Sequence, residues 1–348
     1  MTTTHDTIAA PEVPAIPGLR FRSYRGLDDI PGMAAVADAA NRAAGSADSR
    51  SVEAMLAQYR NLENCEPERD IVLAEVDGAT VAYQRTWWAD RAEGTRGFVA
   101  VSFVHPDHTG RGIEETLLAL GVRRQFELAA ELRGRLEARP GILVRFARGT
   151  VPGEADRLEQ AGFRSARRYA ELVRADFENL AVVPPPAGIE LGRIDPTDET
   201  IIRRAWDVSA EVFADSWGEN PATEAEWRKF RESPSCQPAL WCVAFDTATG
   251  EVAGQILNFL GPVETDGSVV GWTESIGVRA PHRRRGVASA MLAESLRIVR
   301  DAGATRAALG VDQQNPNEAQ TLYERLGFQV TLEELEYHRP IEPAEGER

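Results

Sequence analysis

The sequence repeats itself once, at a spacing as long as a whole domain. The stretch FVHPDHTGRGIEETLLALG near residue 110 resembles GVRAPHRRRGVASAMLAES near residue 286, and LEQAGFRSARRY near residue 160 resembles YERLGFQVTLEE near residue 325. The two copies lie on the order of 170 residues apart, which is the size of one ordinary domain. A chain of 348 residues with this repeat is expected to form two similar domains.

A run of prolines marks the expected boundary between the copies. Pro184 to Pro186 can neither continue a helix nor donate hydrogen bonds to a strand ladder, so this segment reads as a linker. We therefore expect a disordered tail over 1–17, a first domain over 18–178, a Pro-rich linker over 179–187 and a second domain over 188–342.

The second copy has a readable order of elements: strand, two helices, three strands, helix, strand, helix, strand. The unit from the strand TESIGV to the strand RAALGVD requires two parallel strands, ending at Val278 and Asp312, because a helix connects them. Thr223 suits a helix N-cap and Gly303 a helix C-terminal stop. The predicted fold class is α/β (α+β), with a mixed, mostly antiparallel sheet, one parallel strand pair and flanking helices in each domain.

Composition excludes several classes of function. The net charge of −15 argues against a general nucleic-acid binder, which would carry a basic face. No apolar run is long enough to span a membrane, and the N-terminus does not have the pattern of a signal peptide. Cys65, Cys236 and Cys242 lack metal-ligand spacing. We expect a cytoplasmic monomer or homodimer with reduced cysteines, no metal, and neither a nucleic acid nor a membrane as partner.

Three consecutive arginines, Arg283 to Arg285, stand where a strand ends and a helix begins. Cations are unfavourable at a helix N-terminus, which already carries partial positive charge. The placement becomes reasonable if the loop binds a phosphate, because N–H groups from about Arg284 to Ser289, including those of Val287 and Ala288, would point outward. Gly286 would let such a ligand approach the backbone. A solvated basic loop is the alternative.

These residues resemble the acyl-CoA motif of the GCN5-related N-acetyltransferases, the GNAT family. The similarity is carried by SIGVRAPHRRRGVASAML and GVDQQNPNEAQTLYERLGF, and the double layout resembles the tandem GNAT proteins, a group that includes mycothiol synthase. The resemblance implies acetyl-CoA as the donor and an amine as the acceptor. It also implies that the two parallel strands separate and that backbone groups of Ile276, Gly277 and Val278 pair with the pantetheine arm.

The resemblance also suggests roles for side chains. It implies that Tyr323 donates a proton to the departing sulfur, although a packing tyrosine is the alternative. Glu274 is the candidate base, expected on the same strand face as Val278 and shielded by Trp272, although it could simply face solvent. Asn315 would contact the pantetheine arm, cap its helix, or both. The loop FADSWGEN, with Asp215, Trp217 and Glu219, could wall the acceptor pocket.

The first copy departs from the motif. Thr109 stands in place of the leading arginine, Glu114 in place of Ala288, and Leu158 in place of Tyr323. A carboxylate at the phosphate position would repel an anion, so we expect the first domain to be inactive. The predicted function is acetyl transfer to the primary amine of a small molecule. A non-enzymatic acyl-CoA sensor, mycothiol synthase activity and N-acetylation of a protein remain alternatives.

Overall fold

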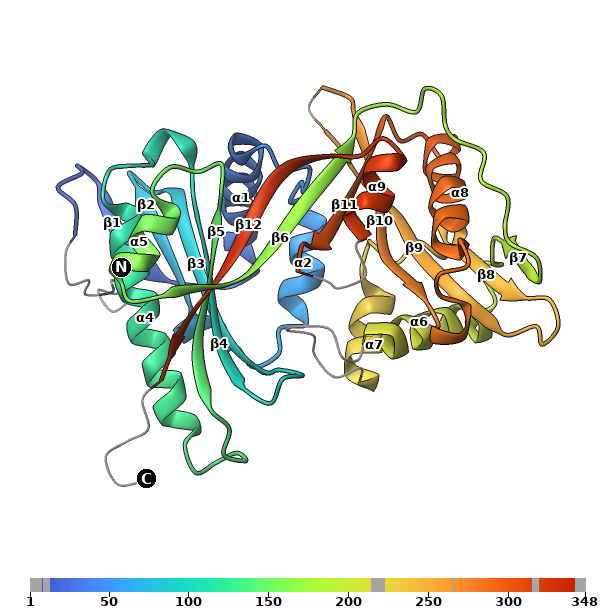
Figure 1. The fold of residues 1–348 in the computed structure, drawn as a ribbon. Coiled ribbons are helices and arrows are strands. Elements are labelled where there is room, and N and C mark those ends of the chain that lie inside the picture. The colour runs from blue at the N-terminus through green and yellow to red at the C-terminus, as the bar shows by residue number, and fades with distance from the viewer. Residues whose placement is uncertain (1–7, 9–12, 214–222, 265, 315–318, 342–348) are drawn as a thin grey trace. The chain divides into compact units, whose positions relative to one another are not determined.

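The computed structural model describes residues 8, 13–213, 223–264, 266–314 and 319–341, and its chain divides into two compact units (Figure 1). Unit 1 comprises Met1–Arg168 and Glu334–Arg348, and unit 2 comprises Tyr169–Glu333. No helix among the described residues is both long and apolar enough to cross a bilayer.

Unit 1 is built on a mixed sheet with the strand order β1-β2-β3-β4-β5-β12. Its elements in chain order are β1 (Leu19–Ser23), η1 (Leu27–Asp29), α1 (Ile30–Ala44), α2 (Val52–Arg60), α3 (Pro67–Asp70), β2 (Ile71–Val76), β3 (Ala79–Asp90), β4 (Arg96–Val104), η2 (Pro106–His108), α4 (Ile113–Leu132), β5 (Gly141–Arg148), α5 (Glu154–Gln160) and the start of β6 (Arg164–Arg174).

Unit 2 repeats this plan with the strand order β6-β11-β10-β9-β8-β7. Its elements after β6 are β7 (Ile189–Gly192), α6 (Glu199–Phe213), α7 (Glu224–Glu232), η3 (Pro238–Leu240), β8 (Cys242–Asp246), β9 (Val252–Val263), β10 (Val269–Val278), η4 (Ala280–His282), α8 (Val287–Asp301), β11 (Arg306–Asp312), α9 (Ala319–Arg325) and the start of β12 (Gln329–Pro340). The predicted order of elements is confirmed, and so is the parallel pairing of β10 with β11.

The predicted helix-capping residues, Thr223 and Gly303, lie at helix ends as expected. The Thr223 side chain accepts a hydrogen bond from the N–H of Glu226 at the start of α7. After α8, Gly303 has a φ of 102°, a left-handed conformation in which glycine lacks the Cβ clash of other residues. The N–H of Gly303 donates to the carbonyl of Arg300, which satisfies an orphan acceptor at the helix end.

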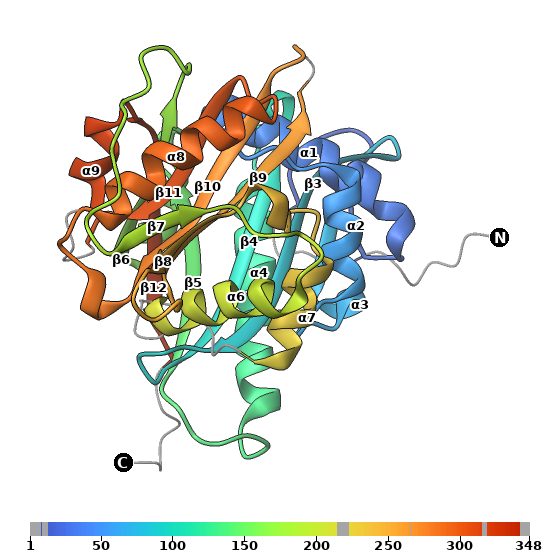
Figure 2. The ribbon, with the colours of Figure 1, turned by 90° about the vertical axis from the view of Figure 1, so that its right-hand side faces the viewer.

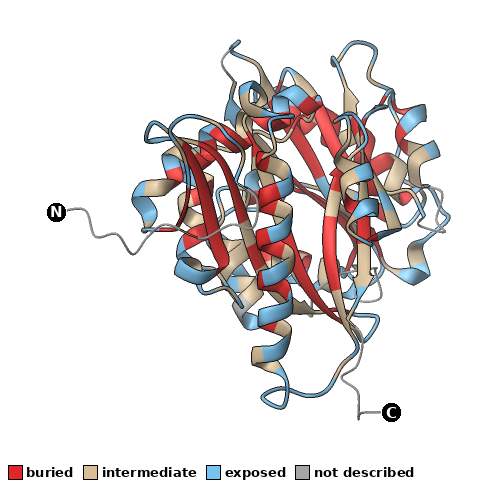
Figure 3. Ribbon diagram, turned by 90° about the vertical axis from the view of Figure 1, so that its left-hand side faces the viewer, coloured by how far each residue is buried: buried red, intermediate tan, exposed pale blue. Residues whose placement is uncertain are grey.

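The cores lie between helices and sheet in both units, and Figure 3 shows the buried residues concentrated in the strands and on the inward faces of the helices. In unit 2, α8 covers one face of the sheet through a cluster that includes Met291, Leu292 and Leu309. The opposite face is covered by α6 and α7 (Figure 2), around the fully buried Trp241 and Ile202. Truncating such a buried leucine to alanine costs about 2–5 kcal/mol.

The last strand of each copy joins a different sheet from the one that the expected domain division assigns to it. β5 pairs antiparallel with residues 334–340 of β12, the final strand of the chain. In the second sheet, β11 pairs antiparallel with residues 169–174 of β6, the final strand of the first copy. Each copy therefore supplies the strand that completes the other sheet. Sequence similarity placed β12 within the second domain because adjacency along the chain was the only available guide.

Some residues of the expected tail and of the expected linker contact the folded part of the protein. Residues 1–7 and 9–12 lie outside the described residues, but the N–H of Ile8 donates to the carbonyl of Phe21, and Ile16 packs on the core of unit 1. Residues 179–187 contain neither helix nor strand, as predicted. They are nevertheless attached to α8, because Arg297 donates to the carbonyl of Ala181 at 2.7 Å.

Candidate active site

The loop that leads into α8 has the backbone of an anion-binding site. Arg284 has a φ of 57° and Gly286 has a φ of 90°, so two left-handed residues flank Arg285. Gly286 is the N-cap of α8, and the N–H of Ala290 donates to the carbonyl of Gly286 at 3.1 Å. The preceding N–H groups, from Val287 to Ser289, have no partner in the helix by its geometry. A Cβ built on Gly286 meets no atom within 4 Å, so the backbone is open to a ligand.

The three arginines at this loop differ in their contacts. Arg283 donates from its Nε to the carbonyl of Val278 at 2.8 Å, which ties the loop to the end of β10. Arg285 contacts the ring of His282 at 3.3 Å and donates to the carbonyl of Ala187 at 2.9 Å. All three residues are exposed and surround the N-terminus of α8 with positive charge. This arrangement fits a pyrophosphate, which would offset the unfavourable placement of the cations.

Unit 1 contains the same loop with its anion position filled. Gly110 and Gly112 have φ values of 69° and 92°, and Arg111 contacts the ring of His108 at 3.3 Å, as Arg285 contacts His282. In this copy, however, the carboxylate of Glu114 accepts a hydrogen bond from the N–H of Gly110 at 2.7 Å. The side chain of Pro14 also lies 3.2 Å from the position that a Cβ on Gly112 would take.

The two parallel strands of unit 2 separate within β10. Their pairing runs only from Val270, opposite Arg306, to Trp272, opposite Ala308. Beyond that point the Thr273 hydroxyl donates to the carbonyl of Ala308 at 3.4 Å. The remaining residues of β10, up to Val278, have no ladder partner on β11. Of their backbone groups, the carbonyl of Val278 accepts a hydrogen bond from Arg283.

A β-bulge lies in this separated part of β10. The register with β9 shifts between Glu274, which faces Leu257, and Gly277, which faces Gln255. Ser275 inside the bulge has a φ of 51°, an uncommon conformation for a residue with a Cβ. In unit 1, the pairing of β4 with β3 continues from Arg96 to Val104 without a shift. The bulge therefore distinguishes the two copies.

The bulge corrects one expectation about Glu274. Cross-strand partners share a face, and the partners of Glu274 and Val278 are Leu257 and Gly254, which lie three residues apart on β9. Glu274 and Val278 consequently point to opposite faces, because the extra residue shifts the alternation of side chains. Glu274 lies on the same face as Leu257, which packs in the cluster beneath α6, and its side chain is exposed. The expected desolvation of its carboxylate by Trp272 is therefore wrong.

Tyr323 is a buried residue of α9. It is 6% exposed, and its ring meets that of Phe328 edge-to-face with centroids 6.4 Å apart. Burial raises the pKa of Tyr323 to about 12. The phenol is therefore neutral at physiological pH and can donate a hydrogen bond but not act as a base.

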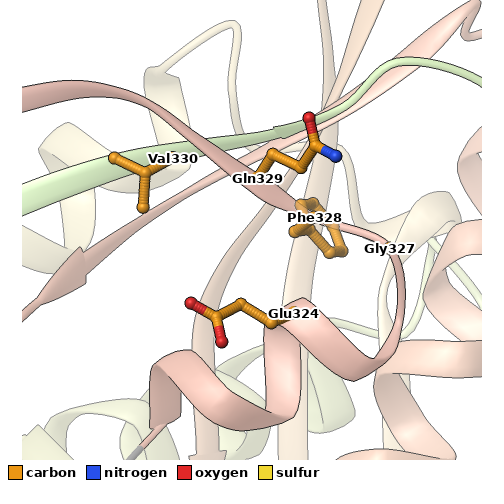
Figure 4. Close-up of a pocket in the computed structure, with 5 residues that line it drawn as sticks. All are labelled: Glu324, Gly327, Phe328, Gln329 and Val330. Atoms are coloured by element: carbon orange, nitrogen blue, oxygen red, sulfur yellow. The ribbon is translucent and has the colours of Figure 1, made fainter.

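A pocket of about 480 Å³ lies where α9 turns into β12, next to Tyr323 in the chain (Figure 4). Its lining residues are Glu324, Gly327, Phe328, Gln329 and Val330. Asn315 and the acceptor-loop residues Asp215, Trp217 and Glu219 fall outside the described residues. Across the part of the chain that the structure describes, no three His, Cys, Asp or Glu side chains gather as a metal site.

The sequence reasoning missed Gln255 and Gly254 on β9. Gly254 allows β9 to approach β10 closely, since a Cβ there would lie 2.7 Å from the carbonyl oxygen of Gly277. Gln255 is fully buried and donates from Nε2 to the carbonyl of Ser275 at 3.3 Å. The available signal was the polar pair Gln255 and Asn258 inside the otherwise apolar strand VAGQILNFL.

Separated parallel strands, a bulged strand and an anion-binding helix N-terminus together define an acyltransferase of the GNAT type. The Acetyltransferase (GNAT) family matches residues 203–328. A mycothiol acetyltransferase of Salinispora arenicola is 30% identical over 86% of this chain and 90% of its own length. This chain belongs to the GNAT acetyltransferase family and is an acyltransferase.

Two solved structures have the same double architecture. A GCN5-related N-acetyltransferase from Sphaerobacter thermophilus aligns with a TM-score of 0.70 and 25% identity, covering 93% of this chain and 96% of that one. A tandem GNAT protein from the clavulanic acid biosynthesis pathway aligns with a TM-score of 0.61 and 15% identity, covering 94% of this chain and 100% of that one. The second likeness concerns the fold alone.

Proposed function

We propose that unit 2 transfers the acetyl group of acetyl-CoA to the primary amine of a small molecule, and that unit 1 does not catalyse transfer. The observation that carries the proposal is the contrast between the two phosphate loops. The loop before α8 is open at Gly286, whereas in the loop before α4 the Glu114 carboxylate accepts from the backbone N–H of Gly110.

The residues of unit 2 can be assigned roles in this reaction. Arg283, Arg284, Arg285 and the N–H groups from Gly286 to Ser289 would hold the pyrophosphate, and the backbone of Ile276, Gly277 and Val278 would pair with the pantetheine arm. The donor supplies a thioester whose carbonyl carbon is open to attack by an amine. Asn315 remains a proposed contact to the same arm.

Glu274 is the proposed base. An alkylamine has a pKa near 10 and is mostly protonated at neutral pH, so it must lose a proton before it attacks. The exposed carboxylate of Glu274, directly or through water, takes that proton. A new C–N bond forms at the carbonyl carbon and the C–S bond breaks, so the thiolate is the leaving group. The attacking nitrogen releases its second proton to solvent as the amide forms.

Tyr323 stabilises that thiolate as a hydrogen-bond donor. Its pKa of about 12 lies above the value of about 8.5 for an ordinary thiol, so complete proton transfer from the phenol to the sulfur is unfavourable. The hydroxyl instead donates a hydrogen bond as negative charge develops on the sulfur, and the thiolate then takes its proton from solvent. A charge-assisted bond of this kind is stronger than a neutral one.

The experiment that tests the proposal is an assay of thiol release from acetyl-CoA with the purified full chain and a panel of primary amines. Amine-dependent release supports the proposal. Release with none of the amines, or release that persists when the loop before α8 is disabled, contradicts it.

The curated relatives favour a second, narrower candidate. Three of them carry the name mycothiol acetyltransferase, and the first is similar along nearly its entire length. The panel should therefore include the amine precursor that such an enzyme acetylates. Preference for that precursor over simple amines, measured as kcat/KM, would select this candidate. The family match also disfavours a purely non-enzymatic sensor.

A further inference from the structure

Gln255 touches the bulge of β10 from a neighbouring strand. The residue is fully buried on β9, and its Nε2 donates to the carbonyl oxygen of Ser275 at 3.3 Å. A Cβ on Gly277 would lie 2.6 Å from that nitrogen. The side chain therefore crosses directly above Gly277 to reach Ser275, and only glycine at position 277 leaves room for it.

This contact leaves one polar atom of Gln255 unsatisfied. Oε1 is buried and has no hydrogen-bond partner within the described part of the chain. Exchanging the amide nitrogen and oxygen would not help, because the Ser275 carbonyl can only accept and must face the nitrogen. An orphaned buried acceptor costs free energy, and so does a left-handed serine. Both unfavourable features meet at the same bulge, which points to a function for the arrangement.

Unit 1 has different residues at the matching places. Alignment of Val104 with Val278 at the strand ends puts Tyr83 and Phe103 where Gln255 and Gly277 stand, and these two rings stack with centroids 5.3 Å apart. That strand pair is regular and contains no bulge. The glutamine, the glycine and the bulge thus occur together, in the copy whose phosphate loop is open.

We propose that Gln255 is a positioning residue for acetyl transfer: its amide holds the left-handed conformation of Ser275, and the bulge so fixed aims Glu274 toward the α6 face and presents the backbone of Ile276 between β10 and β11. Gln255 acts through Ser275 and does not touch the reacting atoms. The inference rests on the proposed function for its catalytic consequence, but its structural part can be tested without activity.

The decisive experiment combines Gln255→Leu with Ser275→Gly in the full chain. Leucine removes the donated hydrogen bond at similar volume. Glycine adopts a positive φ without strain, so it removes the need for a bond that holds Ser275. We expect Gln255→Leu to lower kcat by roughly tenfold or more and to raise the KM for acetyl-CoA by a smaller factor, since small misplacement of reacting groups is costly. We expect the double variant to recover most of the lost kcat.

Asn258 provides a matched control. It is a fully buried amide on the same strand with an unpartnered Oδ1, but it donates to Ser295 and to the carbonyl of Leu240 and not to the bulge. Asn258→Leu should change the melting temperature and leave kcat within about twofold, because surface and core changes outside a site act chiefly on stability. An equal loss of kcat in Asn258→Leu and Gln255→Leu would overturn the proposal.

Amide hydrogen exchange over residues 273–278 provides a readout independent of turnover. Gln255→Leu should make the amide protons of these residues exchange faster than in the wild type. The double variant with Ser275→Gly should recover turnover in the activity assay. Unchanged exchange together with unchanged kcat overturns the inference, and so does a double variant as slow as the single one. If the wild type releases no thiol with any amine, the proposed function fails, while faster exchange in Gln255→Leu still supports the structural part. Gln255→Met replaces Gln255→Leu if the latter does not fold.

Discussion

The carboxylate of Glu114 accepts a hydrogen bond from the backbone N–H of Gly110 at 2.7 Å, in a loop whose counterpart in unit 2 carries Ala288 at the position of Glu114. The first copy thus supplies its own anion to the backbone that would otherwise bind a phosphate. Two loops with similar backbone φ values consequently differ at this position, where one carries a carboxylate and the other a methyl group.

Placing that side chain in unit 2 should close its loop. In Ala288→Glu, the new carboxylate is expected to accept from the N–H of Arg284 as Glu114 does from Gly110, and to repel the pyrophosphate. We expect acetyl-CoA affinity, measured by titration calorimetry, to fall by at least about 100-fold, which corresponds to roughly 2.7 kcal/mol. The fold should persist, since unit 1 already contains this arrangement.

The number of acetyl-CoA molecules bound per chain tests the same assignment. The full chain should bind one acetyl-CoA, and Glu114→Ala should still bind one, because Thr109 and the packed Pro14 also separate this loop from its counterpart. A tight site that persists in Ala288→Glu would show that unit 1 binds the cofactor and would contradict the assignment.

Tyr323→Phe should reduce turnover without affecting cofactor affinity. The variant removes only the hydroxyl, so we expect kcat to fall by about 100- to 1,000-fold, as is usual when one donor to a developing charge is lost. Because the pKa of Tyr323 is about 12, the phenol stays protonated throughout the assay range. The ratio of wild-type to variant kcat should therefore be constant from pH 6 to 9, and equal kcat values would remove Tyr323 from the mechanism.

Glu334 makes the stability of unit 1 depend on pH. It lies opposite Arg148 on β5, and burial raises its pKa to about 7, with Glu154 and Asp48 adding to the rise and Arg148 and Arg50 opposing it. A folded pKa above the ordinary value of about 4.5 means that its contribution is complete below that value and is lost as the pH rises through 7. Urea denaturation should show Glu334→Gln to have a flatter dependence between pH 4.5 and 8. A slope equal to that of the wild type would contradict this account.

A protease site inserted after Val182 should not separate the two copies. Val182 is 83% exposed, so cleavage is expected to proceed readily. Strands β6 and β12 each complete the sheet of the other copy, so the nicked chain should elute as one species in native size-exclusion chromatography and separate only in denaturant. The isolated fragment 18–178 lacks the partner of β5 and should aggregate through that edge. A monomeric, folded fragment would count against this prediction.

The order of elements in unit 2 could be predicted because local periodicity and end signals decide it. The alternation in GIELGRI, the cap at Thr223 and the stop at Gly303 each act over a few residues, and the structure confirms them. The bulge at Ser275 could not be predicted, because strand propensity treats TESIGV as a regular strand. Its cause is a side chain 20 residues earlier, at Gln255.

The glycine turn at the start of α8 could be predicted because Arg283, Gly286 and Ala288 occur at fixed spacing between a strand and a helix. The face on which Glu274 lies could not be predicted, since one inserted residue reverses the alternation on which the inference depended. The exchange of β6 and β12 was hidden for a similar reason. Sequence similarity assigns each of these strands to its own copy. It does not indicate with which strand each one forms hydrogen bonds.

The exchange of final strands imposes an order on biosynthesis. While the ribosome is still translating the second copy, β5 is paired with β4 on one side only, because residues 334–340 on its other side are not yet made. One edge of the first sheet therefore stays unpaired until the C-terminal strand emerges. Premature termination before the end of β11 would leave both sheets incomplete. We therefore expect the two copies to depend on each other to complete their sheets, although they are similar in sequence.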